Sequence, residues 1–106
     1  MVIVEYIRYV LKEHTPDTFV AAYAEAARHL AAAPECVDYE LTQCVDEQTS
    51  FVLRIRWLSA AAHLKAFRMG PNFPPFLAAI RPFVSEIAEM RHYALTAIAG
   101  GGSAAS

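Results

Sequence analysis

The sequence predicts an α+β domain in which strands and helices follow the order β-α-β-β-α-β. Polar and apolar residues alternate in four segments, residues 2–12, 35–45, 50–58 and 85–96, which is typical of half-buried strands. Apolar residues recur at helical spacing between the first and second of these segments, and a shorter helical pattern lies between the third and fourth. A chain of 106 residues forms one hydrophobic core, so we expect a single domain over residues 1–96.

The first strand and the first helix have clear boundaries in the sequence. Residues 2–12 combine alternation with β-branched and aromatic side chains, which favours a strand. Thr15 is a suitable N-cap residue, and Pro16 fits the first helical position because its missing N–H has no partner there. The helix is expected to reach about Ala33 and to end before Pro34.

The middle of the chain predicts a β-hairpin followed by short helices. Residues 35–45 and 50–58 alternate on either side of the polar turn 46–49. Ser59 then caps a second helix over residues 60–68, which the prolines and glycine of residues 70–75 interrupt. A short third helix is expected over residues 75–81, limited by Pro82, before the last strand at 85–96. Residues 97–106 are mostly small and offer little to bury, so we expect a flexible tail there.

This order predicts a ferredoxin-like four-stranded antiparallel sheet with its helices on one face. Alternation assigns the more apolar residues to the helix-covered face: Ile3, Ile7, Tyr9, Leu11, Val37, Tyr39, Leu41, Phe51, Leu53, Ile55, Trp57, Met90 and His92. The opposite face receives a mixed set: Tyr6, Arg8, Asp38, Glu40, Thr42, Arg54, Arg56, Glu89, Arg91 and Tyr93. Cross-strand ion pairs are expected there, and the face is either solvated or packed on a second subunit.

Composition excludes several classes of partner. Nine basic and eleven acidic residues give a formal charge of -2 without a basic cluster, so nucleic acid is not expected as a partner. No uncharged apolar run is long enough to span a membrane and the N-terminus is not a signal peptide, so we expect a cytoplasmic protein without membrane contact. Cys36 and Cys44 lie about 26 Å apart along one predicted strand, too far for a disulfide. The hydrophobic share of 56% is high for a small domain and favours a partner chain.

Several motifs together resemble a known family. They are a hairpin strand ending in Trp57, the run S-x-x-x-H-L-x-x-F-R from Ser59 to Arg68, the loop FPPF and the closing segment EMRHY. This pattern is similar to the antibiotic biosynthesis monooxygenase (ABM) family of small dimeric α+β barrel proteins. The resemblance implies a homodimer joined through the sheet faces, with a pocket between helices and sheet in each protomer. It further implies a cofactor-independent monooxygenase that oxidises a small quinol or polycyclic aromatic substrate with dioxygen.

His63 is the leading candidate for the catalytic base. Quinol oxidation requires removal of a proton, and the pKa of histidine is close to neutral pH. Alternatively, His63 is a boundary histidine bonded to a backbone carbonyl. Trp57 and His92 are the other catalytic candidates, although both also fit a role in the core. Substrate contacts are expected from Tyr23, Phe67, Phe73, Phe76 and Met90. No histidine pair has HxH or HxxxH spacing, so no metal site is expected.

Other functions remain open. The same fold could be a non-catalytic module that binds a hydrophobic ligand or docks a partner enzyme, since no nucleophile motif or nucleotide loop is visible. Haem binding or degradation is a weaker third alternative. The haem-degrading relatives carry an asparagine on their first strand, and residues 2–12 contain none.

Overall fold

The computed structural model describes residues 1–103; the last three residues of the predicted tail, 104–106, lie outside the described part. The elements in chain order are β1 (Ile3–Val10), α1 (Pro16–Ala31), β2 (Cys36–Gln43), β3 (Ser50–Trp57), the π-type turn η1 (Ala62–Phe67), α2 (Phe73–Ile80), the 3-10 turn η2 (Arg81–Glu86) and β4 (Ile87–Ala94). The predicted element order is therefore confirmed. Across residues 1–103, no helix is long and apolar enough to cross a membrane.

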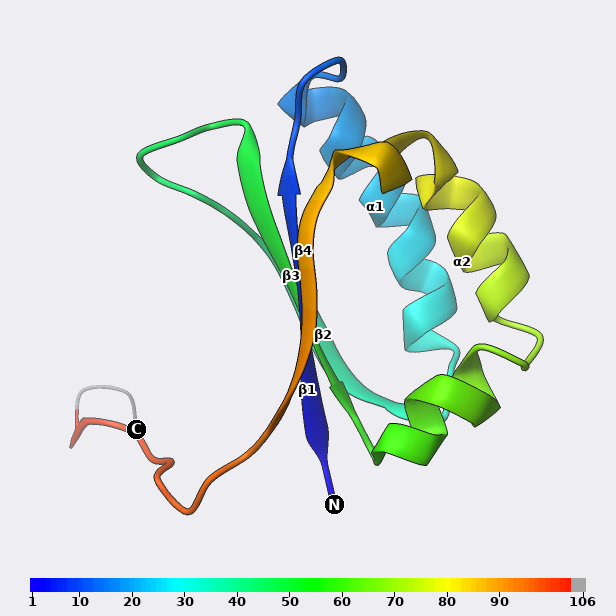
Figure 1. Cartoon of the computed structure of the whole chain (residues 1–106), viewed down its shortest axis with the longest axis vertical. Helices are drawn as coiled ribbons and strands as arrows, with labels where there is room; N and C mark the ends of the chain where they lie inside the picture. Colours follow the sequence, from blue (N-terminus) through cyan, green and yellow to red (C-terminus); the bar gives the residue numbers. More distant parts are fainter. Residues whose placement is uncertain (104–106) are drawn as a thin grey trace.

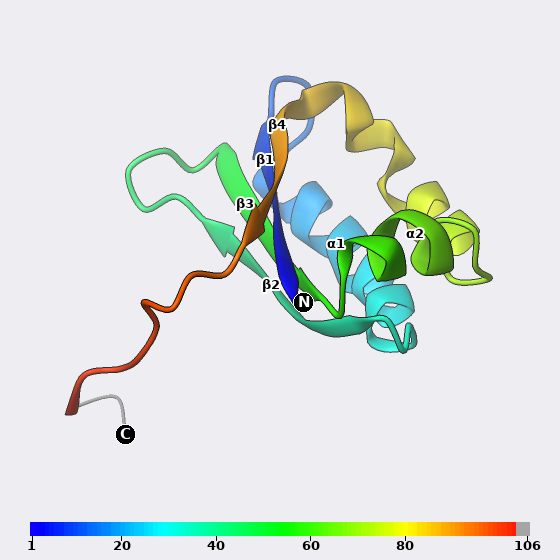
Figure 2. The same cartoon turned by 60° about the horizontal axis from the view of Figure 1, so that its bottom comes forward.

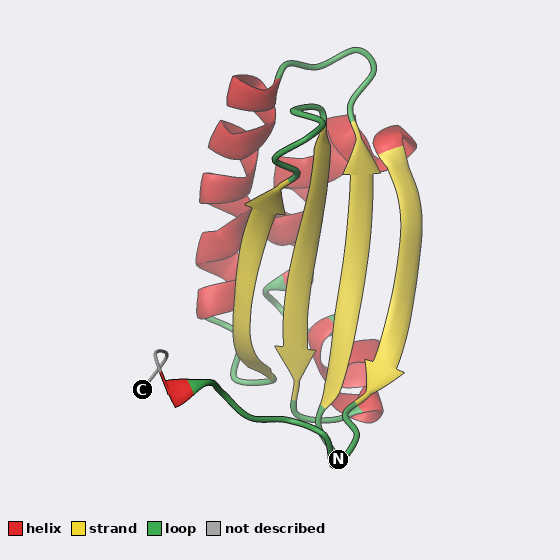
Figure 3. Cartoon of the chain, turned by 90° about the vertical axis from the view of Figure 1, so that its left-hand side faces the viewer, coloured by secondary structure: helices red, strands yellow, loops and turns green. Residues whose placement is uncertain are grey.

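The four strands form one antiparallel sheet in the order β2-β3-β1-β4 (Figure 1). β1 lies in the middle, where Ile3 pairs with Trp57 of β3 on one side and with Ala94 of β4 on the other. α1 and α2 cover one face of the sheet, and Figure 3 shows the other face open toward the viewer. This is the predicted ferredoxin-like arrangement, and it places the inward side chains of β1 and β3 under the helices.

α1 begins and packs as the sequence predicts. The hydroxyl oxygen of Thr15 accepts a hydrogen bond of 3.2 Å from the backbone N–H of Thr18, and Pro16 occupies the first turn. The helix buries a stripe on its sheet-facing side that consists of Phe19, Tyr23, Ala26 and Leu30. Burial of this stripe holds the helix on the sheet.

The connection between β3 and β4 begins less regularly than the helix predicted over residues 60–68. Ser59 accepts a hydrogen bond of 3.0 Å from the N–H of Ala62, which fulfils the predicted capping role, but the chain then forms the π-type turn η1. A Cβ atom at Gly70 would lie 2.4 Å from the carbonyl oxygen of Ala66, so a side chain cannot be placed there without a shift of the backbone. The next helix, α2, begins at Phe73, and Pro82 lies inside η2 rather than ending the helical segment. The last strand consequently begins at Ile87 instead of residue 85.

The core lies between the sheet and the two helices. Its largest buried side chains are Trp57, Tyr9, Phe19, Phe51, Leu30, Leu53 and Ile55. The assignment of Val37 to this face is wrong: its side chain is 41% exposed. An irregularity in the β2–β3 pairing falls between Cys36 and Asp38, and Cys36 packs against the core instead. Cys36 and Cys44 are both free thiols.

The uncovered face carries the expected ion pairs. Arg54 forms a bidentate pair with Glu40, and Arg56 forms one with Asp38. The hydrogen bonds from these guanidinium groups lower the pKa of both carboxyl groups below their ordinary values. The rings of Tyr6 and Tyr93 meet edge to face on the same surface, 5.4 Å apart, and both side chains are partly exposed. The exposed face thus combines charged pairs with aromatic rings.

Candidate functional site

Four polar and aromatic side chains from four elements meet at one end of the helix-covered face. Glu5 lies on the central strand β1, and its register partners are Ile55 of β3 and His92 of β4. Trp57 ends β3, and His63 lies in η1, which follows directly after β3. Figure 2 shows η1 beside the N-terminal end of β1. We call Glu5, Trp57, His63 and His92 the β1 cluster.

Hydrogen bonds and ring contacts connect the β1 cluster. The indole Nε1–H of Trp57 donates to Oε1 of Glu5 at 3.0 Å. Nδ1 of His63 and Nε2 of His92 share a hydrogen bond of 2.9 Å. Nε2 of His63 lies 3.5 Å from Oε1 of Glu5, and Nε2 of His92 lies 3.5 Å from Oε2 of the same carboxylate. The imidazole of His63 also stacks on the indole of Trp57, with centroids 4.6 Å apart and planes 16° from parallel.

The cluster is buried at one end and open at the other. Glu5 and His63 are 2% and 3% exposed, whereas the side chain of His92 is 35% exposed. Burial raises the pKa of the Glu5 carboxyl above its ordinary value, against the opposing effects of the Trp57 hydrogen bond and the nearby His92 and Arg68. Burial also lowers the pKa of His63 to about 4, and His92 and Arg68 act in the same direction. His63 is therefore a neutral imidazole at neutral pH.

A cavity of about 170 Å³ lies next to the cluster, between the sheet and the segment from η1 to β4. Glu5 and Arg68 are its charged lining residues, and its aromatic wall consists of Tyr9, Trp57, Phe67, Phe73 and Phe76. The guanidinium carbon of Arg68 lies 5.8 Å from the centroid of the Phe73 ring, a cation–π distance. The cavity thus presents one carboxylate and one guanidinium inside aromatic walls.

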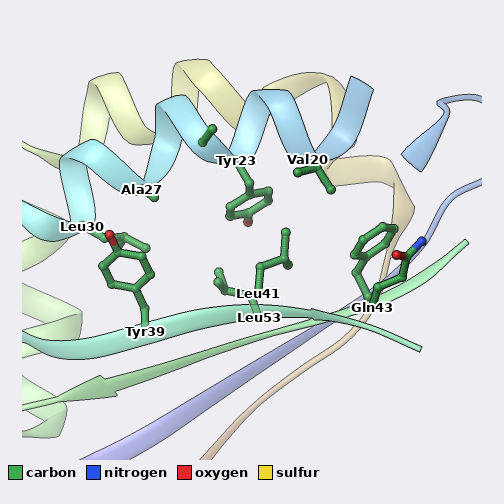
Figure 4. Close-up of a pocket in the computed structure, with 10 residues that line it drawn as sticks. Val20, Tyr23, Ala27, Leu30, Tyr39, Leu41, Gln43 and Leu53 are labelled. Atoms are coloured by element: carbon green, nitrogen blue, oxygen red, sulfur yellow. The ribbon is translucent and has the colours of Figure 1, made fainter. Parts of the chain in front are cut away.

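A separate groove of about 390 Å³ runs between α1 and the β2–β3 hairpin (Figure 4). Its lining is mostly apolar, with Val20 and Leu30 above the sheet and Tyr39, Leu41 and Gln43 on β2. Figure 4 shows the Tyr23 side chain pointing from α1 toward the sheet inside this groove. The hydroxyl groups of Tyr23 and Tyr9 share a short hydrogen bond, and Tyr9 lines the 170 Å³ cavity. The tyrosine pair therefore lies between the two spaces.

The groove is the larger of the two spaces, but we assign the site to the cavity. A binding site for a polar aromatic molecule requires polar groups that converge on an enclosed apolar space. The cavity offers Glu5 and Arg68, whereas the lining of the groove contains no charged residue. Burial raises the pKa of Tyr9 to about 12, so its hydroxyl group stays protonated near the cavity.

The structure brings most of the predicted site residues together. Five of them line the cavity: Trp57, Phe67, Phe73, Phe76 and Met90. His63 and His92 contact each other, but they are not lining residues and contact Glu5 instead. Tyr23 lines the groove rather than the cavity because its hydroxyl is directed at Tyr9.

Sequence reasoning missed Glu5. It occupies the inward position between Ile3 and Ile7 in the alternation of β1, so a charged residue at a core position was the available signal. Arg68 ends the S-x-x-x-H-L-x-x-F-R run, but nothing in the sequence indicated that it would face the same cavity as Glu5. These two residues supply the charge of the site.

Comparison with known proteins agrees with this architecture. The model of the family described as antibiotic biosynthesis monooxygenase matches residues 1–81. YczJ of Bacillus subtilis strain 168, an uncharacterised protein, is 20% identical over 83 residues, which cover 78% of this chain and 87% of YczJ.

Solved structures show the same fold. SnoaB, a cofactor-independent oxygenase from Streptomyces nogalater, superposes with a TM-score of 0.71 at 22% identity, covering 93% of this chain and 95% of SnoaB. Rv0793 from Mycobacterium tuberculosis gives a TM-score of 0.68 at 20% identity, covering 94% of this chain and all of Rv0793 (100%). Because the family model matches most of this chain, residues 1–81, the chain belongs to the antibiotic biosynthesis monooxygenase family.

Proposed function

We propose that the protein is a cofactor-independent monooxygenase that oxidises a small quinol with dioxygen in the 170 Å³ cavity. The observation that carries this proposal is the buried Glu5 carboxylate at the wall of an aromatic cavity that also holds Arg68. Family membership and the fold shared with SnoaB, a cofactor-independent oxygenase, support the same reaction class.

Glu5 acts as the proton acceptor in this proposal. A quinol hydroxyl that lies against the carboxylate transfers its proton to Glu5 and becomes an electron-rich anion. Arg68 stabilises that anion by its positive charge inside a cavity whose lining is mostly apolar. The rings of Phe67, Phe73 and Phe76 hold the flat substrate through stacked and edge contacts.

The substrate itself supplies the electrons. The quinol anion gives electrons to dioxygen, one oxygen atom enters the ring, and the other leaves as water. The product is a hydroxyquinone, and the balance is quinol plus dioxygen to hydroxyquinone plus water. No external reductant is required.

Trp57, His63 and His92 position the carboxylate. Trp57 holds Oε1 of Glu5 in place by its hydrogen bond, and His63 stacks on the face of the indole. His63 was the predicted base, but Glu5 is the group that lines the cavity, so we assign His63 and His92 to orienting Glu5.

The size of the cavity favours a substrate with one ring, or two at most. Pockets for drug-sized ligands occupy about 300–1,000 Å³, well above the 170 Å³ found here. A substrate of three or four fused rings would require the aromatic wall to move. We therefore favour the quinol over the polycyclic substrate class.

We also propose that two copies of the chain pack through the uncovered sheet face. The exposed Tyr6 and Tyr93 and the cross-strand ion pairs of that face offer both apolar contact and hydrogen-bonding groups. The high hydrophobic share of the sequence supports a covered face.

A second function is favoured by the groove between α1 and β2. Its 390 Å³ and mostly apolar lining suit a hydrophobic ligand held without chemistry. A native mass spectrum of gently purified protein tests this function. A bound apolar molecule that is lost in a Leu41→Lys variant supports it, and a spectrum of the bare chain counts against it.

Oxygen uptake tests the main proposal. Purified protein is mixed with reduced menadione, with a single-ring quinol and with a three-ring anthrone, and oxygen consumption is followed above the rate without protein. We expect uptake with the one-ring or two-ring quinol and little with the anthrone. Uptake that is no faster than without protein for every quinol would overturn the proposal.

A further inference from the structure

We infer that Glu5, His63 and His92 form a binding site for one divalent transition-metal ion such as Zn²⁺. One ligand atom from each side chain can be chosen so that all three lie within 4.8 Å of one another. The expectation of no metal site rested on the spacing of histidines along the sequence. The three donors come instead from β1, η1 and β4, which only the fold brings together.

The spacing of the donor atoms suits a metal of this class. Zinc lies about 2.0–2.2 Å from nitrogen and oxygen ligands, so neighbouring donors around it are separated by about 3.0–3.5 Å. Nδ1 of His63 and Nε2 of His92 are 2.9 Å apart, and Nε2 of His92 lies 3.5 Å from Oε2 of Glu5. The first separation is just below this range, the second lies within it, and the third pair of donors lies within 4.8 Å, so the side chains need a modest adjustment to close around an ion.

The type of donor selects the kind of ion. Two imidazoles and one carboxylate suit zinc, iron, cobalt or nickel, whereas Mg²⁺ and Ca²⁺ prefer oxygen ligands alone. Trp57 donates to Oε1 of Glu5 and leaves Oε2 facing His92, as a residue that orients a ligand carboxylate would. His92 is the partly exposed member of the three and gives an ion access from solvent.

The charges near this site both favour and oppose the binding of a cation. The buried carboxylate of Glu5 attracts a cation, and the imidazole of His63 carries no charge of its own. Arg68 is close enough to influence both groups and opposes a second positive charge. Replacement of Arg68 by methionine is therefore expected to tighten metal binding, while loss of a ligand weakens it.

This inference does not depend on the proposed oxygenase reaction. A metal bound to Glu5 would occupy the carboxylate that the proposed reaction uses as its proton acceptor, so the two states exclude each other. Zn²⁺ is accordingly expected to slow quinol oxidation wherever that oxidation is observed. Metal binding itself is measured without quinol, so the two proposals can fail separately.

Two titrations of chelator-treated protein test the site. Zn²⁺ binding is measured in a calorimeter, and Co²⁺ binding is followed by the visible absorption of the bound ion. We expect one ion per chain in the wild type and at least about tenfold weaker binding in His92→Ala. His92→Ala removes a partly exposed side chain, so the fold should persist, and circular dichroism checks this. Glu5→Gln should weaken binding in the same way.

His29→Ala is the matched control, since His29 lies 3.7 Å from Glu25 on the surface of α1, away from the cluster. Its affinity for Zn²⁺ should equal that of the wild type. Absence of stoichiometric binding by the wild type would overturn the inference. So would an unchanged affinity in His92→Ala, or a loss of binding in His29→Ala.

Discussion

Trp57 and Glu5 are joined by a hydrogen bond of 3.0 Å from the indole N–H to the carboxylate, and both side chains are almost fully buried. A buried carboxylate is costly unless its charge is compensated by hydrogen bonds or by a nearby positive charge. β3 delivers the indole and β1 delivers the carboxylate from positions 52 residues apart. The fold thus maintains an ionisable group in a place where an ordinary core would hold leucine.

Replacement of Trp57 by phenylalanine removes the donor and keeps an aromatic ring in the core. A hydrogen bond to a charged group contributes about 1.5–3 kcal/mol, so Trp57→Phe should lower the free energy of unfolding by at least that amount. Urea denaturation of Trp57→Phe, Glu5→Gln and the double variant measures the coupling between the two residues. Strictly additive losses in the double variant would show that the hydrogen bond contributes nothing.

The Tyr23→Phe variant tests whether the substrate binds in the cavity or in the groove. The substitution removes the hydroxyl that pairs with Tyr9 and leaves the ring in place. Because a buried hydroxyl loses its partner, the free energy of unfolding should fall by about 1–2 kcal/mol. The KM for the quinol should stay unchanged, since Tyr23 does not line the cavity. A large rise in KM would place the substrate in the groove instead.

Glu86 makes stability depend on pH in the acid range. Burial alone would raise the pKa of its carboxyl, but hydrogen bonds from the backbone N–H groups of Lys12 and Glu13 and from His14 lower it to about 2. A carboxyl with a depressed pKa in the folded state stabilises the fold above its unfolded pKa of about 4.5. This stabilisation should be lost as the pH falls from about 4.5 to about 2.

Glu86→Gln should therefore be less stable than the wild type by about 2–3 kcal/mol near pH 7, and the difference should shrink toward pH 2. Urea denaturation at a series of pH values gives the difference directly. Glu89→Gln is the matched control, because Glu89 is half-exposed on β4, where its carboxylate pairs with Arg91. A constant difference across the acid range would contradict the assigned role of Glu86.

The uncovered sheet face makes a prediction about assembly. Tyr93→Arg places a further positive charge at the exposed Tyr6–Tyr93 contact. If two copies pack through this face, light scattering should show a dimer for the wild type and a larger monomer fraction for Tyr93→Arg. Leu64→Arg, which changes an exposed residue of η1 on the helix side, should leave the assembly unchanged. Equal assembly of both variants would remove the sheet face as the interface.

Much of the fold could be predicted because local signals agree with the tertiary arrangement. The cap at Thr15, the proline at position 16 and the alternation of β1 and β3 each have a single structural outcome, and the structure confirms them. The break between β2 and β3 at Val37 was missed because a bulge shifts the alternation by one residue without any local marker. η1 was expected to be an ordinary helix because several of its residues are good helix formers.

The candidate site was less predictable than the fold. The aromatic wall could be predicted, because large side chains at helix–sheet positions must line whatever space remains. The role of Glu5 could not, because it depends on a tryptophan 52 residues away and on two histidines from different elements. Pairing of this kind is set by strand register and not by local sequence.

The role of Glu5 as the proton acceptor in the aromatic cavity is the central proposal, and oxygen uptake by Glu5→Gln tests it most directly. The substitution keeps the size of the side chain and removes the base, and Glu47→Gln in the exposed hairpin turn is the matched control. A general base contributes about 10²–10⁴ to a rate, so the kcat for quinol oxidation should fall by at least about 100-fold in Glu5→Gln and remain unchanged in Glu47→Gln. Equal rates for folded Glu5→Gln and wild type would contradict the account.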